Sequence, residues 1–306
     1  MKREGHVYER THEWDNIRKA EVSATTRKLK RRDVQKHIAN RIRNLTEIQQ
    51  GLIEKTIRTT EYEHMVVSNG AKMRDISKLR FHPNHIHQQT LVEVGENYIE
   101  NHLIDDTYAS RKGKGQIHAA LRVERWLREH PETTKWYVQG DVTKFYENIR
   151  HSFLKKLLLR IFKDEDFVEA LMEPVRKFAP DGIGVPLGTR VSQILANLVL
   201  SCLDWYAKHV VRKKFYIRYM DDFVVLTTTK GEARRFIRGA TQLLNEIGFD
   251  LHEPKVHRIA GEGLDYLGYV FYENGNKFWR QRNKKEWLKR GKGITNKKRL
   301  KEIDSA

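Results

Sequence analysis

The chain has 306 residues, of which 39% are hydrophobic and 32% are charged, a balance that excludes a disordered polar chain. Its 58 Lys and Arg against 40 Asp and Glu leave a net charge of +18, which favours nucleic acid as the partner over a merely well-solvated surface. No apolar run approaches the roughly 18 residues of a membrane span, and the N-terminus lacks the apolar core of a signal peptide. We therefore expect a cytoplasmic protein without membrane contact, in which the single cysteine, Cys202, is a buried structural thiol.

The first part of the chain combines basic residues with helical periodicity. Apolar residues recur at three- and four-residue steps over 18–59, which predicts a basic helical segment. An extended stretch follows, in which Asn69 and Gly70 predict a hairpin turn. Two further helices are predicted over 85–103 and 116–130.

The remaining predicted elements mix helices with short strands. The predicted helices are 148–178, 191–210 and 232–248, and the predicted strands are 136–141, 215–220, 223–226, 249–254, 257–261 and 264–272. This mixture predicts helices packed on an antiparallel sheet, an α+β architecture. The basic end of the chain, 276–306, is too polar to form much core of its own and predicts a solvated tail.

Two adjacent aspartates, Asp221 and Asp222, stand between the apolar runs FYIRYM and FVVL. An isolated Asp-Asp pair is most often a surface turn, but burying two like charges is costly unless a cation lies between them. Neighbouring residues of a flat strand point to opposite faces, so we expect both aspartates in the tight turn of a hairpin. Asp141, at the end of an upstream predicted strand, offers a third carboxylate.

Three carboxylates could hold two magnesium ions, because Mg²⁺ prefers hard oxygen ligands. Two such ions about 3.5 to 4 Å apart serve in-line phosphoryl transfer, in which they stabilise the attacking and leaving oxygens. We predict two Mg²⁺, with Mn²⁺ as a possible substitute. In a chain of charge +18, the predicted substrates are a nucleic acid and a nucleotide.

The segments DVTKFY, GVPLGTRVSQILANLVLSCLD and YMDD together resemble the palm of a reverse transcriptase. With YASRKGKGQIHA upstream and LDYLGYVF downstream, the resemblance extends from about Lys72 to about Phe271. It implies a right-hand polymerase with an antiparallel palm sheet packed on helices. The implied parts are an N-terminal basic helical segment (1–71), fingers (72–140), a catalytic palm (141–271) and a short basic thumb or tail (272–306).

The resemblance also implies roles for individual residues. Asp141, Asp221 and Asp222 match the catalytic, metal-binding triad, and Tyr146 matches the aromatic gate that excludes a ribose 2′-hydroxyl. The remaining matches are to residues that bind the nucleotide, the template or the primer. They are Arg74, Arg111, Lys112 and Lys255 for the triphosphate, Leu187, Gly188 and Gln193 for the nucleotide and template pocket, and Tyr266, Leu267, Gly268 and Tyr269 for the primer.

The implied function is an RNA-directed DNA polymerase that uses an RNA template, a DNA primer and deoxynucleotides. Leu187 replaces a glutamine found in many reverse transcriptases, and Ser192-Gln193 replaces Ser-Pro, as in enzymes of diversity-generating retroelements. This departure predicts reduced base discrimination and hence an error-prone retroelement enzyme. A viral RNA polymerase is disfavoured by Met220, where those enzymes usually carry glycine, and by the bulky Tyr146.

Two alternatives remain open from the sequence. One is a phage-defence reverse transcriptase that makes DNA from a bound noncoding RNA, or by protein-primed synthesis without a template. The other is a non-catalytic RNA-binding scaffold, against which the intact triad argues. The short thumb, with no room for a ribonuclease H or endonuclease domain, predicts an accessory protein, a structured noncoding RNA or an oligomer that completes the grip on the duplex.

A histidine cluster, His82, His85 and His87, has spacing that a zinc site could use. No cysteine accompanies it, so we expect these histidines on the surface or facing nucleic acid.

Overall fold

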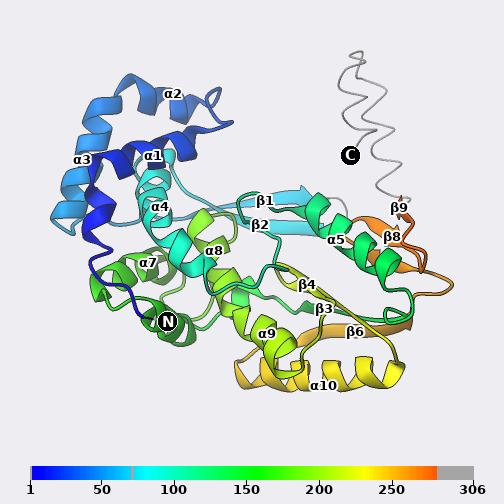
Figure 1. Cartoon of the computed structure of the whole chain (residues 1–306). Coiled ribbons are helices and arrows are strands. Elements are labelled where there is room, and N and C mark those ends of the chain that lie inside the picture. The colour runs from blue at the N-terminus through cyan, green and yellow to red at the C-terminus, as the bar shows by residue number, and fades with distance from the viewer. Residues whose placement is uncertain (1, 70–71, 281–306) are drawn as a thin grey trace, which may run out of the picture. The chain divides into compact units, whose positions relative to one another are not determined.

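The computed structural model of the protein describes residues 2–69 and 72–280 (Figure 1). The chain divides into two compact units, each made of two segments: the first is Met1–Ile104 with Lys144–Cys202, and the second is Asp105–Thr143 with Leu203–Ala306. Within the described ranges, no helix has the length and apolar character that crossing a membrane requires. The predicted solvated tail lies outside the described residues from 281 onward. The division into fingers, palm and thumb stays a prediction.

The first unit is mainly helical and carries one long hairpin. Its elements are α1 (Trp14–Thr25), α2 (Arg32–Ala39), α3 (Arg41–Ile53), β1 (Glu63–Asn69), β2 (Lys72–Lys78), α4 (Ile86–Glu100), α6 (His151–Ile161), α7 (Glu165–Phe178) and α8 (Arg190–Val199). The helical periodicity predicted over 18–59 is confirmed by the helices α1, α2 and α3. The predicted hairpin is confirmed by the antiparallel pairing of β1 with β2, while Gly70 of its turn lies outside the described residues.

One histidine of the cluster, His87, lies in the interior of the first unit, while His82 and His85 are partly exposed. His87 is 3% exposed, His85 stacks on Phe81 with ring centroids 5.7 Å apart, and His82 stacks on His37 at 5.9 Å. Burial, reinforced by the nearby Arg58, lowers the pKa of His87 to about 4, so its imidazole is neutral. The predicted surface position is therefore wrong for His87, because a neutral imidazole packs in a core at far lower cost than a charged one.

The second unit is built on an antiparallel sheet with the strand order β4-β5-β3-β6. The elements are α5 (Gln116–Glu129), β3 (Trp136–Val142), β4 (Tyr216–Tyr219), β5 (Asp222–Thr227), α10 (Lys230–Glu246), β6 (Leu251–Arg258), β7 (Leu264–Tyr266), β8 (Tyr269–Phe271) and β9 (Lys277–Trp279). The last three form a second, smaller antiparallel sheet. The two strands predicted over 249–254 and 257–261 are wrong: one continuous strand, β6, replaces them.

The short helix α9 (Ser201–Trp205) contains the boundary between the two units. Cys202 lies in it and is partly exposed, so the prediction of a buried thiol is wrong. Its Sγ lies 3.1 Å from the carbonyl oxygen of Val199, within reach of a thiol hydrogen bond.

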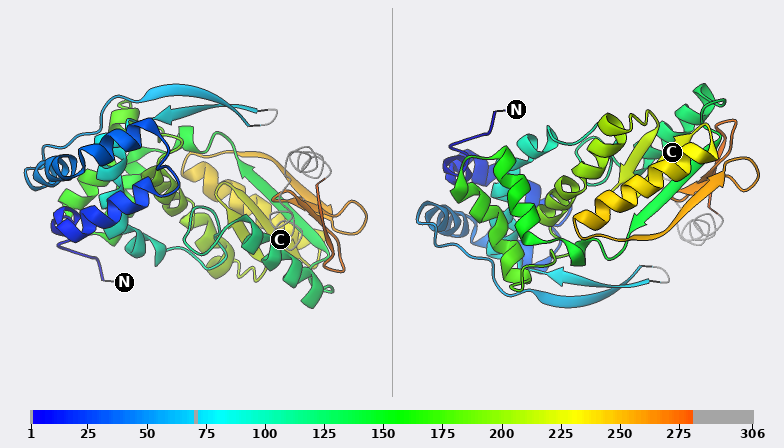
Figure 2. Two further views of the ribbon diagram at one scale, coloured as in Figure 1. Left: turned by 90° about the horizontal axis from the view of Figure 1, so that it is seen from above. Right: turned by 90° about the horizontal axis from the view of Figure 1, so that it is seen from below.

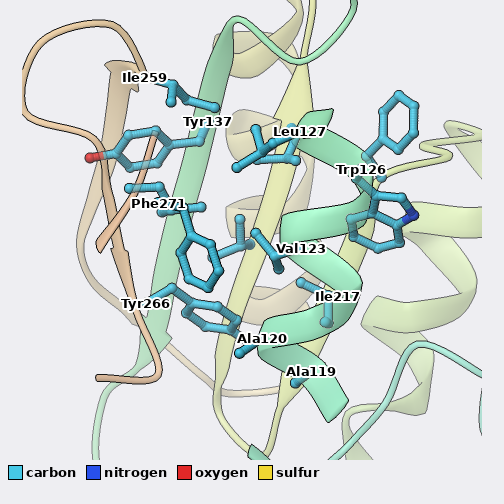
Figure 3. Close-up of a cluster of buried hydrophobic side chains, with 14 of the residues drawn as sticks. Ala119, Ala120, Val123, Trp126, Leu127, Tyr137, Ile217, Ile259, Tyr266 and Phe271 are labelled. Atoms are coloured by element: carbon cyan, nitrogen blue, oxygen red, sulfur yellow. The ribbon is translucent and has the colours of Figure 1, made fainter. Parts of the chain in front are cut away.

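The four-stranded sheet is covered on both faces. On one face α10 runs along the strands (Figures 1 and 2), and its Phe236 packs edge-on against Phe223 at 6.2 Å. On the other face, α5 packs against the strands in a buried hydrophobic cluster that Tyr266 and Phe271 complete (Figure 3). Because strand side chains alternate, Asp222 lies on the same face as Val224 of this cluster.

Candidate active site

The aspartate pair lies where β4 turns into β5. Tyr219 pairs with Asp222, which leaves Met220 and Asp221 as a two-residue loop, and Met220 has the positive φ of 58° that such tight hairpin loops require. Asp221 is therefore in the loop, but Asp222 is the first residue of β5. The expectation that both aspartates lie in the turn is wrong, because only two residues are free of the hydrogen-bonded ladder.

Asp141 lies directly opposite Asp222. β3 is the antiparallel neighbour of β5, and its register pairs Asp141 with Asp222 although about 80 residues separate them in the sequence. Side chains that face each other across such a pair have Cβ atoms about 4.5 to 5.5 Å apart. The sheet thus brings the three predicted catalytic carboxylates to one end of two neighbouring strands.

A local irregularity surrounds Asp141. Its neighbour is Gly140, which has no side chain and so leaves room for the buried ring of Phe223. A Cβ at this position would lie 2.5 Å from Cζ of that ring. On the other side, Gln139 pairs with Lys255 and Asp141 with His252, so β6 carries an extra residue at this point. Such bulges bend a strand and re-aim side chains.

Burial and like charge govern the electrostatics of Asp222. Burial above all, together with the negative charges of Asp141 and Asp221, raises the pKa of the Asp222 carboxyl to about 7. A hydrogen bond from Nε2 of Gln139 to Oδ1 of Asp222, 3.5 Å long, and the positive charge of Arg280 oppose this shift. The carboxylates therefore meet at a place where negative charge is in excess.

Further predicted site residues belong to the same unit. The Arg111 guanidinium donates from Nη1 to the carbonyl oxygen of Thr107 (2.7 Å), while Lys112 and Lys255 are exposed. The hydroxyl of Tyr266, a residue matched to the primer contact, reaches toward the Asp222 carbonyl oxygen at 3.4 Å. The segment β7–β8 thus packs beside the carboxylates.

The predicted residues of the first unit form a separate group. Tyr146 begins a short 3-10 helix (Tyr146–Asn148), and its carbonyl oxygen accepts a hydrogen bond from the Val185 amide (2.9 Å). That amide belongs to the GVPLG loop, so Tyr146 and the loop are tied together. Arg74 is part of β2, and its side chain lies outside what the structure describes.

The GVPLG loop rests on β2. The Ser77 amide donates to the carbonyl oxygen of Leu187 (3.2 Å), and a Cβ at Gly188 would lie 3.0 Å from Cγ2 of Ile76. Gly188 has φ of 114°, a conformation that side chains rarely adopt. Gln193 follows in the first turns of α8 and is partly exposed.

Residues 71–271 match the family model of the reverse transcriptase (RNA-dependent DNA polymerase). The chain belongs to the reverse transcriptase family. Protein YkfC of Escherichia coli (strain K12) is 23% identical over 219 residues, which cover 58% of this chain and 57% of YkfC. An uncharacterized 91 kDa protein in the cob intron of Schizosaccharomyces pombe is 29% identical over 151 residues, 44% of this chain and 18% of that protein. The chain therefore spans little more than half of one relative and under a fifth of the other.

Solved structures of telomerase share the fold of this chain. The apo telomerase of Candida tropicalis has a TM-score of 0.54 at 10% identity, over 72% of this chain and 49% of that one. Telomerase from Candida albicans in complex with a TWJ fragment of telomeric RNA has a TM-score of 0.53 at 10% identity, over 74% and 48%. This likeness confirms the predicted α+β polymerase fold with its antiparallel sheet and helices.

The carboxylates of Asp141, Asp221 and Asp222 suit a hard divalent cation. Mg²⁺ prefers carboxylate oxygens, and a cation would offset both the burial and the like charges that raise the pKa of Asp222. Among residues 2–69 and 72–280, however, no three His, Cys, Asp or Glu side chains converge closely enough to form a ready metal centre.

Sequence reasoning missed a buried ion pair behind the aspartate loop. Arg218 of β4 and Asp204 of α9 are both fully buried, and Nε and Nη2 of Arg218 bind the two carboxylate oxygens at 2.7 and 2.6 Å. The signal was present, since each is a charged residue inside an otherwise apolar run, IRYM or SCLDWY. A buried charge of this kind needs a partner of opposite sign.

Proposed function

We propose that the chain is an RNA-directed DNA polymerase whose catalytic, metal-binding residues are Asp141, Asp221 and Asp222. One observation carries the proposal: Asp141 stands opposite Asp222 in adjacent strands, with Asp221 in the adjoining loop. The family match over 71–271 supports it independently. A non-catalytic scaffold would gain nothing from placing three carboxylates where burial and like charge raise the pKa of one of them.

Each side chain then has a role in joining a deoxynucleotide to a primer. Two Mg²⁺, or Mn²⁺ in their place, would supply electrostatic stabilisation of the attacking and leaving oxygens. Arg111, Lys112, Arg74 and Lys255 bind the triphosphate, since cationic side chains match phosphate oxygens. Tyr146 rejects the ribose 2′-hydroxyl.

The template side of the site completes the proposal. Leu187, Gly188 and Gln193 line the pocket of the nucleotide and its template base. We assign 72–140 as fingers and 141–271 as palm, and we propose an accessory protein or a structured noncoding RNA as a further partner. The charge of +18 suits an RNA template and a DNA product.

For the biological use, we propose an error-prone retroelement enzyme of the diversity-generating type. Leu187 supports this, because an aliphatic side chain cannot hydrogen-bond beside the base pair as a glutamine would. The names of relatives found in introns favour a retroelement in general terms. The alternative, phage defence by protein-primed synthesis, predicts that the purified protein carries DNA covalently attached to a Tyr or Ser. Purified protein without such DNA would speak against that alternative.

The polymerase proposal is tested with purified full-length chain, a poly(rA) template, an oligo(dT) primer and Mg²⁺, supplied with dTTP or UTP. We expect incorporation of dTTP, and we expect Asp222→Asn to reduce it by roughly 100-fold or more. Asp15→Asn, which changes an exposed carboxylate in the first turn of α1, is the matched control and should retain the parent rate.

Three outcomes would contradict the proposal in different ways. A preference for UTP would replace the DNA polymerase by an RNA polymerase. Activity that survives Asp222→Asn would overturn the assigned site. Binding of the primed template without any incorporation by the parent would favour the RNA-binding scaffold.

A further inference from the structure

The buried carboxylate of Asp204 accepts hydrogen bonds from three different side chains. Arg218 donates twice, Tyr216 donates its hydroxyl to Oδ1 at 2.7 Å, and Thr107 donates its hydroxyl to Oδ2 at 3.0 Å. All four side chains are buried in the second unit. A buried ion pair offsets its desolvation only when its remaining polar atoms are satisfied, and here the carboxylate is satisfied from several sides.

One of these partners leads to the aspartate loop. Nη1 of Arg218 donates to the carbonyl oxygen of Met220 at 2.7 Å. Met220 is the first residue of the two-residue loop, and Asp221 is the second. The guanidinium that Asp204 holds in place therefore fixes the backbone that presents Asp221.

A second partner leads to the predicted triphosphate-binding arginine. Thr107 gives its hydroxyl to Asp204, while its carbonyl oxygen accepts the hydrogen bond from Nη1 of Arg111 at 2.7 Å. Thr107 thus connects the buried carboxylate to the side chain of Arg111 in one step.

The backbone joins the same two segments. The Arg218 amide donates to the carbonyl oxygen of Asp106, and the Tyr108 amide donates to that of Arg218, both at 3.0 Å. Residues 106–108 are therefore paired to the edge of β4. The segment that leads to Arg111 and the hairpin that carries Asp221 share one anchored strand edge.

We propose that Asp204 is a positioning residue that holds the aspartate loop and Arg111 in a fixed mutual geometry, so that the triphosphate and the carboxylates meet correctly. The proposal rests on the proposed polymerase function. Its physical basis is that displacing a reacting group by about 1 Å can cost roughly 100-fold in rate. The hydrogen bonds through Arg218 fix the position of the aspartate loop, and those through Thr107 fix the position of Arg111 and thereby of the nucleotide.

The Thr107 connection is tested by comparing Thr107→Val with Tyr216→Phe in the full-length chain. Each variant removes one hydroxyl donor from the same carboxylate, but only Thr107 connects Asp204 to Arg111. On poly(rA)/oligo(dT) with Mg²⁺, we expect Thr107→Val to raise KM for dTTP roughly fivefold, the value of one lost hydrogen bond, with kcat within about twofold. Tyr216→Phe should lower the melting temperature to a similar extent and leave KM unchanged.

Equal changes of KM in the two variants would reduce Asp204 to a purely structural role and overturn the proposal. So would an unchanged KM in Thr107→Val.

The Arg218 connection is tested by Arg218→Lys, which keeps the positive charge beside Asp204 but replaces the planar guanidinium fork, whose three nitrogens reach both Asp204 oxygens and the Met220 carbonyl oxygen, by a single ammonium nitrogen. Mn²⁺ is titrated into the protein without nucleic acid, and free Mn²⁺ is followed by electron paramagnetic resonance. We expect the Mn²⁺ dissociation constant to rise by roughly tenfold, since one charge-assisted hydrogen bond that places the loop is lost. Tyr216→Phe, the control, should bind Mn²⁺ like the parent.

This second readout separates the two proposals. A parent protein that binds Mn²⁺ but does not polymerise defeats the proposed function, while the comparison of Arg218→Lys with Tyr216→Phe still decides the positioning role. A folded Arg218→Lys with parental Mn²⁺ affinity overturns the proposal. If circular dichroism shows that Arg218→Lys does not fold, Thr107→Val is titrated with Mn²⁺ and dTTP together instead. An affinity for dTTP equal to that of the parent protein would then overturn the positioning role of Asp204.

Discussion

Replacing Gly140 by alanine should destabilise the second unit, because the new methyl group would overlap the ring of Phe223. A Cβ at this position would lie 2.5, 2.8 and 3.2 Å from three ring carbons, inside the optimal carbon separation of about 3.5 to 4.0 Å. Phe223 is fully buried, with the rings of Tyr216 and Phe236 each 6.2 Å away, so it has little room to withdraw. We expect overpacking to cost about 1 to 3 kcal/mol of unfolding free energy.

Urea unfolding followed by circular dichroism measures this loss, and Gly231→Ala is the matched control. A Cβ at Gly231, in the first turn of α10, has no neighbour closer than 3.6 Å, so alanine there should stabilise the helix by about 0.5 to 1 kcal/mol. Combining Gly140→Ala with Phe223→Leu should recover part of the lost unfolding free energy, because the smaller leucine side chain leaves space for the new methyl group. If Gly140→Ala unfolds at the same urea concentration as Gly231→Ala, the steric reasoning is wrong.

Three further predictions concern acid stability, sugar selection and fidelity. Burial lowers the pKa of His87 to about 4, against about 6.5 in the unfolded chain, so below pH 6.5 the unfolded state takes up the proton first and stability falls. Between pH 7 and pH 5 we expect His87 to account for about 2 kcal/mol of lost stability, absent in His87→Gln; equal losses in parent and variant, measured by urea unfolding, would contradict this. Tyr146→Val should increase UTP incorporation relative to dTTP by roughly tenfold or more in primer extension, and an unchanged ratio would remove the gate from Tyr146. Leu187→Gln should lower the misincorporation frequency on a sequenced RNA template, and a frequency equal to that of the parent would refute the explanation of low fidelity.

Periodicity located most of the helices and strands. The strands beside Asp221 and the helices α5 and α10 follow from alternating or helical apolar patterns, which are local properties of the chain. The strand β6 was predicted as two pieces because its residues are mostly exposed, so no continuous apolar alternation marks it. Its pairing with β3 holds it extended as one strand.

Charged and polar residues of the interior were the weakest part of the sequence-based prediction. His87 was expected on the surface, and the pairing of Asp204 with Arg218 was not foreseen. Whether such a residue is buried depends on the partner that tertiary structure brings to it, because an unpaired polar group in a core is costly. A short stretch of sequence contains the charged or polar residue but not the distant residue that pairs with it.

The sequence by itself determined the chemistry offered by this protein: two aspartates between apolar strands, a third upstream, a strong positive charge, and the motifs that mark a reverse transcriptase. Only the tertiary structure decided that Asp141 faces Asp222, that Asp221 but not Asp222 lies in the loop, and that the buried Asp204 connects this loop to Arg111. The reason is physical. Strand propensity is a property of neighbouring residues, whereas register and burial arise when segments about 80 residues apart pair and exclude water.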